Sequence, residues 1–125
     1  MLRAYSQGSR GSTESGILHY QLENYTESRE IMSGLLEQDP ENSLVQLYYL
    51  LSSIEKDHQD KALEKLAGLE LNTEHQLGQA IYWYAALAFL KSDRPEEARS
   101  YLHPLVQQQG PYQSDAQRLE KILLK

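Results

Sequence analysis

Residues 82–98 read YWYAALAFLKSDRPEEA and carry the strongest structural signal in the chain. Aromatic and small residues fill the first half, a polar SDRP segment interrupts them, and a helix-like pattern then resumes. Apolar residues recur at helical spacing before and after the SDRP segment, which predicts two helices joined by a tight turn. Asp93 is of a residue type that caps helix N-termini, and Pro95 suits a first helical turn because its missing N–H is not needed there. We therefore predict a helical hairpin.

Short helices are predicted along the rest of the chain as well. The Asp39-Pro40 pair ends one of them, because the residue before a proline avoids the helical region and proline cannot continue the hydrogen-bond ladder. Ser43 is placed to cap the next helix. No stretch alternates for long enough to predict a strand. The predicted helices span residues 16–22, 25–38, 44–55, 59–71, 74–91, 95–108 and 114–125.

A small residue precedes a large apolar residue by four positions in the second helix of each predicted pair. The small residues lie 34 and 36 residues apart along the chain. Two helices approach closely only where the side chains between them are small, so we expect these positions to mark helix crossings. The pairs are Ser28 with Met32, Ala62 with Leu66, and Ala98 with Leu102.

This pattern resembles the tetratricopeptide repeat (TPR), a helical hairpin with a period of about 34 residues. The best-matching stretches are ENYTESREIMSGLLEQDPEN and IYWYAALAFLKSDRPEEARSYL, and the likeness covers about residues 9–110 plus a closing helix. The middle repeat departs from the pattern, since Gln59 and Glu74 stand where an aromatic residue and a proline are usual. The ending is similar to that of small bacterial TPR proteins, several of which are tethered to a membrane by a preceding helix.

The resemblance implies an all-α protein, a right-handed α-solenoid of three hairpins with a C-terminal capping helix. We expect a flexible lead-in at residues 1–8 and one TPR-like domain at 9–125. Its repeats span about residues 9–42, 43–76 and 77–112, and the capping helix spans 113–125. A terminal repeat needs a cover with a polar outer side, and we expect the capping helix to turn Leu119, Ile122 and Leu123 inward.

In TPR proteins the first helix of each pair lines a concave groove. Tyrosine and tryptophan are frequent anchors of protein interfaces, so the resemblance implies a non-catalytic scaffold that binds a partner peptide or protein. Tyr48 and Tyr84 fall at the same position of successive repeats. The groove positions carried over from the family are Ile17, Tyr20, Gln21, Leu47, Tyr48, Leu51, Glu55, Trp83, Tyr84, Leu87 and Lys91.

Charge and hydrophobicity argue against a nucleic acid or a membrane as the partner. The net charge is −6, with lysines and arginines interleaved with acids, so we expect no nucleic-acid binding. The longest run without a charged side chain, residues 75–90, is too short to span a bilayer, and we expect no membrane insertion of this chain.

The sequence offers little for catalysis. Without cysteine there can be no disulfide, thiolate metal site or cysteine nucleophile. No phosphate-binding glycine loop or nucleophile-elbow motif is present. The histidines lack a metal-binding spacing, and we expect no metal, no cofactor and no enzyme activity. They are His19, His58, His75 and His103.

Three alternatives remain open from the sequence. The same surface, or the first repeat, could form a homodimer. The chain could be the soluble domain of a membrane-tethered TPR protein, or a small helical bundle that binds a ligand, since amphipathic helices with short loops also predict a bundle. The lack of cysteine suits a cytoplasmic and a periplasmic protein equally, so the compartment is left open.

Overall fold

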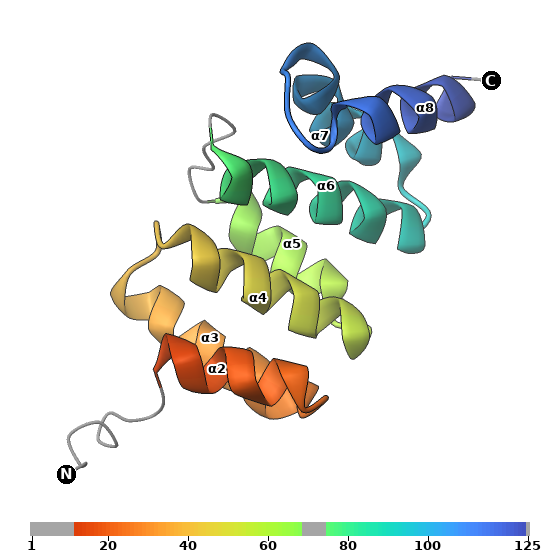
Figure 1. The fold of residues 1–125 in the computed structure, drawn as a ribbon. Coiled ribbons are helices and arrows are strands. Elements are labelled where there is room, and N and C mark those ends of the chain that lie inside the picture. The colour runs from red at the N-terminus through yellow and green to blue at the C-terminus, as the bar shows by residue number, and fades with distance from the viewer. Residues whose placement is uncertain (1–11, 69–74, 125) are drawn as a thin grey trace, which may run out of the picture. The chain divides into compact units, whose positions relative to one another are not determined.

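A computed structural model of the protein describes residues 12–68 and 75–124 (Figure 1). These residues form seven helices and no strand, which confirms the all-α prediction. The predicted lead-in at 1–8, the end of the predicted helix 59–71 and the start of the helix 74–91 lie outside the described residues. The helices are α2 (Thr13–Gln21), α3 (Tyr25–Gln38), α4 (Ser43–Glu55), α5 (Gln59–Ala67), α6 (Gln76–Lys91), α7 (Pro95–Gln107) and α8 (Gln113–Leu123).

The chain divides into two compact units, which we describe separately. The first unit, Met1–Leu69, holds α2 to α5, and the second, Glu70–Lys125, holds α6 to α8. In the first unit α3 packs on α2 and α4, α5 packs on α4, and α2 also touches α4. In the second unit α7 packs on both α6 and α8. The three helix pairs predicted from the sequence, α2–α3, α4–α5 and α6–α7, therefore each form a packed hairpin.

The turns of the three hairpins share one backbone geometry. Glu23, Asp57 and Asp93 have φ values of 65°, 59° and 61°, and they lie 34 and 36 residues apart. The backbone N–H of the residue after each one donates a hydrogen bond to the carbonyl five positions earlier, at 2.8, 2.8 and 2.9 Å. Each left-handed residue itself donates to the carbonyl three positions earlier, at 3.0 to 3.1 Å. Together these bonds make the Schellman motif, which satisfies the last carbonyls of a helix.

Both predicted helix caps are wrong by one residue. Asp93 occupies the left-handed position that ends α6, so Arg94 stands at the N-cap of α7 without a capping side chain. For α4 the cap is Asn42, whose Oδ1 accepts from the Val45 N–H at 3.2 Å, and Ser43 is the first helical residue.

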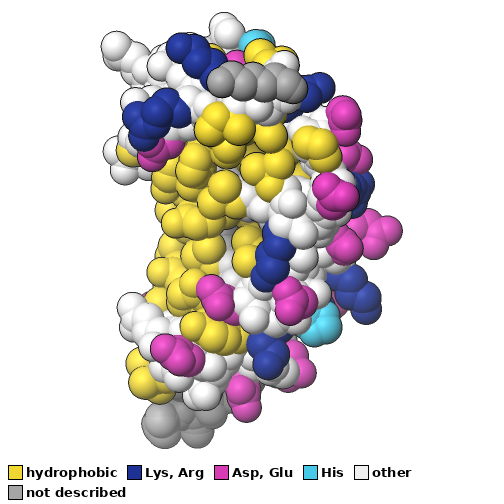
Figure 2. All heavy atoms as spheres, turned by 90° about the vertical axis from the view of Figure 1, so that its right-hand side faces the viewer, with side chains coloured by type: hydrophobic (Ala, Val, Ile, Leu, Met, Phe, Trp, Pro, Cys, Tyr) yellow, Lys and Arg dark blue, Asp and Glu magenta, His cyan; other side chains and the backbone are white. Residues whose placement is uncertain are grey.

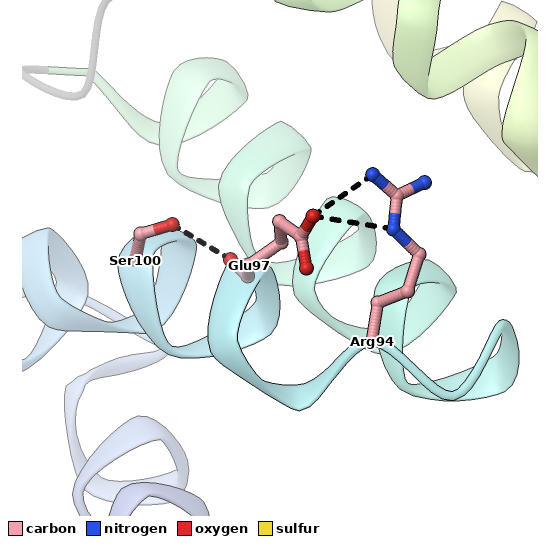
Figure 3. A network of polar contacts seen from close by, with 3 residues as sticks. All are labelled: Arg94, Glu97 and Ser100. Carbon is pink, nitrogen blue, oxygen red and sulfur yellow. Dashed lines mark hydrogen bonds and ion pairs between the residues drawn. The ribbon is translucent and has the colours of Figure 1, made fainter.

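An ion pair lies where α7 lacks a capping side chain. Arg94 donates from Nε and Nη2 to the same oxygen of Glu97, at 3.3 and 2.9 Å (Figure 3). One turn later the Ser100 hydroxyl donates to the Glu97 carbonyl at 2.8 Å. The hydrogen bond to Arg94 lowers the pKa of Glu97 below its ordinary value, and the Arg94 charge adds to the effect. The guanidinium also lies 4.9 Å from the centre of the Phe89 ring, so it bridges the two helices of this hairpin.

The small residues predicted at the helix crossings are fully buried. Ser28, Ala62 and Ala98 are 0% exposed. The Ser28 hydroxyl donates to the Gly16 carbonyl of the facing helix at 2.8 Å. A Cβ on Gly16 would lie 2.5 Å from Cε of the buried Met32, so α2 and α3 meet where both side chains are minimal. This confirms the close approach expected in the first hairpin.

The last helix corrects one prediction. Ala116 is fully buried and Leu119 and Leu123 are half-buried, but Ile122 is exposed. Successive helical residues are about 100° apart around the axis, so a stripe centred on Leu119 and Leu123 leaves Ile122 off its edge. The predicted inward position of Ile122 is therefore wrong.

Candidate functional site

Three tyrosines meet on the first unit. The ring of Tyr20, on α2, lies 5.3 Å from that of Tyr48, on α4, in an edge-to-face contact at 78°. It also lies 5.3 Å from the ring of Tyr25, the first residue of α3, at 61°. All three side chains are half-buried. We call Tyr20, Tyr25 and Tyr48 the tyrosine cluster.

Local structure explains how the cluster forms. Tyr20 lies in the last turn of α2 and Tyr25 begins α3, so the Schellman turn at Glu23 brings the two rings together. The packing of α2 against α4 then adds Tyr48. The sequence predicted Tyr20 and Tyr48 as site residues but missed Tyr25, whose position directly after a hairpin turn is the signal that marks it.

Two carboxylates lie near Tyr25 of the tyrosine cluster. Burial raises the pKa of the Tyr25 hydroxyl above its ordinary value, and the negative charges of Glu55 and then Glu23 raise it further. Both glutamates are exposed, Glu55 at the end of α4 and Glu23 in the hairpin turn. The cluster is thus an aromatic surface with negative charge at its margin.

The other predicted groove residues of the first unit differ in exposure. Ile17 and Leu51 lie one helical turn from Tyr20 and Tyr48 respectively, and both are half-buried. Gln21 is exposed. Leu47 is buried, so in this structure its side chain contributes to the core and offers little surface to a partner.

In the second unit the predicted residues lie along one helix, α6. Trp83, Tyr84 and Leu87 are half-buried and Lys91 is exposed. Trp83 stacks on Tyr112, which precedes α8, with ring centres 5.8 Å apart and planes at 22°. Burial raises the pKa of Tyr112, and the nearby Tyr84 raises it further. Tyr112 therefore belongs to this aromatic surface, although the sequence did not predict it.

Tyr82 has a different role from its neighbours. Its ring lies 5.0 Å from that of Tyr101, on α7, and Tyr101 also contacts Phe89 at 5.3 Å. Burial, and secondarily Tyr82, raises the pKa of the Tyr101 hydroxyl. Tyr82 thus packs between the two helices of the α6–α7 hairpin.

The predicted groove residues therefore fall into two groups, one in each unit. The first unit brings Tyr20 and Tyr48 into contact, and the second aligns four residues on α6. A single groove that joins the two sets stays a prediction. Hydrophobic side chains, in yellow, reach the protein surface in quantity, beside charged side chains of both signs (Figure 2).

Few residues are arranged for other chemistry. Among the described residues no group of three or more histidine, aspartate or glutamate side chains is placed to hold a metal ion. His103 Nδ1 lies 3.3 Å from a carboxylate oxygen of Glu120, a contact that links α7 to α8. In the part of the chain described, no helix has both the length and the apolar character needed to cross a membrane.

Comparison with known proteins identifies no relative: no family model, no curated protein and no solved structure matches this chain.

Proposed function

We propose that the protein is a non-catalytic scaffold whose tyrosine cluster binds a partner peptide or protein. The observation that carries this proposal is the contact between Tyr20 and Tyr48. These rings come from the first helices of two successive hairpins, and both remain partly exposed. Tyrosine gives a large contact area for little loss of side-chain freedom, which is why it is common among the residues that dominate interfaces.

The hairpins themselves are proposed to be TPR-like repeats of one right-handed solenoid. The support is the repeated turn, because the same left-handed residue and the same two hydrogen bonds recur at intervals of 34 and 36 residues. In such an array the first helices α2, α4 and α6 line one surface. In the second unit Trp83, Tyr84 and Leu87 lie on the first helix of its hairpin, α6.

The chemistry of the first unit favours a partner segment with apolar and basic side chains. Ile17 and Leu51 supply apolar contacts on either side of the tyrosines. Glu23 and Glu55 lie close enough to Tyr25 to affect its pKa, and no lysine or arginine occurs among the predicted groove residues of this unit. A lysine or arginine of the partner would gain from both the carboxylates and the faces of the rings.

The test is a peptide-display selection on the immobilised protein, followed by fluorescence anisotropy with the selected peptides. We expect enriched sequences that combine aromatic or aliphatic residues with lysine or arginine. Tyr48→Ala should weaken their binding at least tenfold, since truncation of an interface anchor costs about 2 kcal/mol or more. Tyr48→Phe, which keeps the ring, is the matched variant and should bind nearly as well. Equal binding by wild type and Tyr48→Ala would contradict the proposal.

A further inference from the structure

Two separate surfaces keep large hydrophobic side chains in contact with solvent. In the described part of the chain, the exposed ones are Leu18 (53%), Leu22 (60%), Ile122 (64%) and Leu124 (69%). Leu18 lies in α2, and Leu22 is the C-cap of that helix. Ile122 lies in α8, and Leu124 is the C-cap of that helix. Neither pair includes a residue of the tyrosine cluster, so the proposed function does not account for them.

The α2 patch is apolar and acidic. Glu14, Leu18 and Leu22 are spaced by four residues, so they form one stripe, and all three are exposed. The opposite side of the helix is the one that Gly16 presents to α3. Glu23 follows the stripe and is also exposed. Helix α2 contains no lysine or arginine, so this patch, Glu14, Leu18, Leu22 and Glu23, is negatively charged.

The α8 patch is apolar and basic. Arg118 and Ile122 are four residues apart, Lys121 is adjacent to Ile122, and all three are exposed. Leu124, two residues after Ile122, lies about 200° from it around the helix axis and outside this surface. Asp115 pairs with Arg118 within the same helix, and Glu120 points toward His103 of α7. The patch, Arg118, Lys121 and Ile122, therefore carries two cations, of which Arg118 is paired with Asp115.

We propose that the α8 patch of one copy docks on the α2 patch of another. Ile122 would insert between Leu18 and Leu22, and Arg118 and Lys121 would face Glu14 and Glu23. Burial of these side chains removes apolar surface from water, and the opposite charges favour this pairing. The same charges disfavour α2 against α2 and α8 against α8. The association is thus between unlike patches, made reciprocally in a two-fold dimer or repeated head-to-tail in chains or rings.

Two variants each block one half of the contact. Leu18→Arg places a cation in the α2 patch but keeps the α8 patch, and Ile122→Glu does the reverse. Both positions are exposed, so we expect far-UV circular dichroism and the melting temperature to stay close to wild type. In sedimentation equilibrium the wild-type mass should rise with concentration above the 14.4 kDa of one chain, and more weakly at high salt. Each variant alone should stay at the monomer mass.

Mixing the two variants gives the decisive result. The intact α8 patch of the Leu18→Arg protein should bind the intact α2 patch of the Ile122→Glu protein, and the complex should stop at two chains. Gln107→Glu is the control for Ile122→Glu, because it adds the same negative charge at an exposed position on α7. It should associate as wild type does. A wild type that stays monomeric at every concentration would overturn the proposal. Self-association of the Ile122→Glu protein alone, or a mixture that forms no complex, would overturn it equally.

Discussion

The backbone is left-handed at Glu23, Asp57 and Asp93, a conformation that residues other than glycine rarely adopt. The left-handed region costs such a residue about 1–2 kcal/mol, and aspartate tolerates it better than most because its short side chain can bond locally. Glutamate has no such advantage. Glu23 is therefore the most strained of the three turn residues, although it adopts the same hydrogen bonds as the others.

Glu23→Gly should stabilise the protein by about 0.5–1 kcal/mol, because glycine occupies the left-handed position after a helix without a steric penalty. The midpoint of urea unfolding is the measurement. Glu23→Ala is the control, since alanine removes the same carboxylate but keeps a Cβ. If alanine stabilises as much as glycine, loss of charge and not relief of strain is the cause.

The pair of Arg94 and Glu97 should give a pH-dependent contribution to stability. The pKa of Glu97 is lower in the folded chain than in the unfolded chain, so the folded state binds this proton less tightly. The contribution is therefore present above the unfolded pKa of about 4.3 and disappears as the pH falls through the folded value. The difference in unfolding free energy between wild type and Glu97→Gln should vanish at low pH. NMR titration of the Arg94→Gln protein should show the pKa of Glu97 restored upward.

At the scale of elements, the small residue of the third hairpin can be tested by enlarging it. Ala98 is fully buried on α7, which packs on α6 and α8, so Ala98→Leu would overpack the contact of α7 with its neighbours. We expect a loss of about 1–3 kcal/mol, the usual cost of overpacking. Ala67→Leu, at the exposed end of α5, is the matched control and should change the unfolding midpoint little. A similar effect at both positions would argue against a close crossing.

The contribution of helix α8 to stability can be tested at Ala116, which is fully buried. Ala116→Asp would place a carboxylate against α7, and an unpaired buried charge is costly. We expect a fall in melting temperature of several degrees, and Gln117→Asp, one position away and exposed, should lack this effect. Equal melting of the two variants would mean that α8 contributes little to the second unit.

Helix limits were predicted best where a proline ends the helix. The limits of α3 are those predicted, 25–38, and its end follows from the local sterics of the Asp39-Pro40 pair, whereas α2 begins at Thr13, three residues before the predicted start at residue 16. The caps of α4 and α7 were misplaced by one residue. The start of α7 depends on which residue adopts the left-handed conformation, and that of α4 on which side chain accepts a hydrogen bond from the first helical turn. Ile122 was misplaced because the amphipathic pattern of α8 fits more than one inward direction.

At the scale of the whole molecule, half-buried phenols make stability sensitive to alkaline pH. Burial raises the pKa of Tyr25 in the first unit and of Tyr101 and Tyr112 in the second. Their folded values exceed the unfolded value of about 10, so stability is full below that pH and is lost as the pH rises through the folded values. Unfolding free energies measured across this range should decline. Tyr101→Phe should flatten the decline, and an unchanged slope would refute the assignment.

The all-helical class and the repeated hairpins could be predicted from the sequence because both depend on short-range patterns. The candidate site was only partly predictable. Tyr20 and Tyr48 are 28 residues apart, and their contact depends on how α2 packs on α4. Leu47 shares the apolar character of Tyr48 and Leu51, which are half-buried, but its own side chain is buried in the core. Such differences arise from tertiary packing, which periodicity alone does not specify.

Trp83 is the only tryptophan of the chain, and it stacks on Tyr112 within the second unit. Its indole emission is therefore a native optical reporter for α6 to α8, with no added label. Far-UV ellipticity, by contrast, sums over the helices of both units. Recording the two signals on one sample would separate the unfolding of one half of the protein from that of the other.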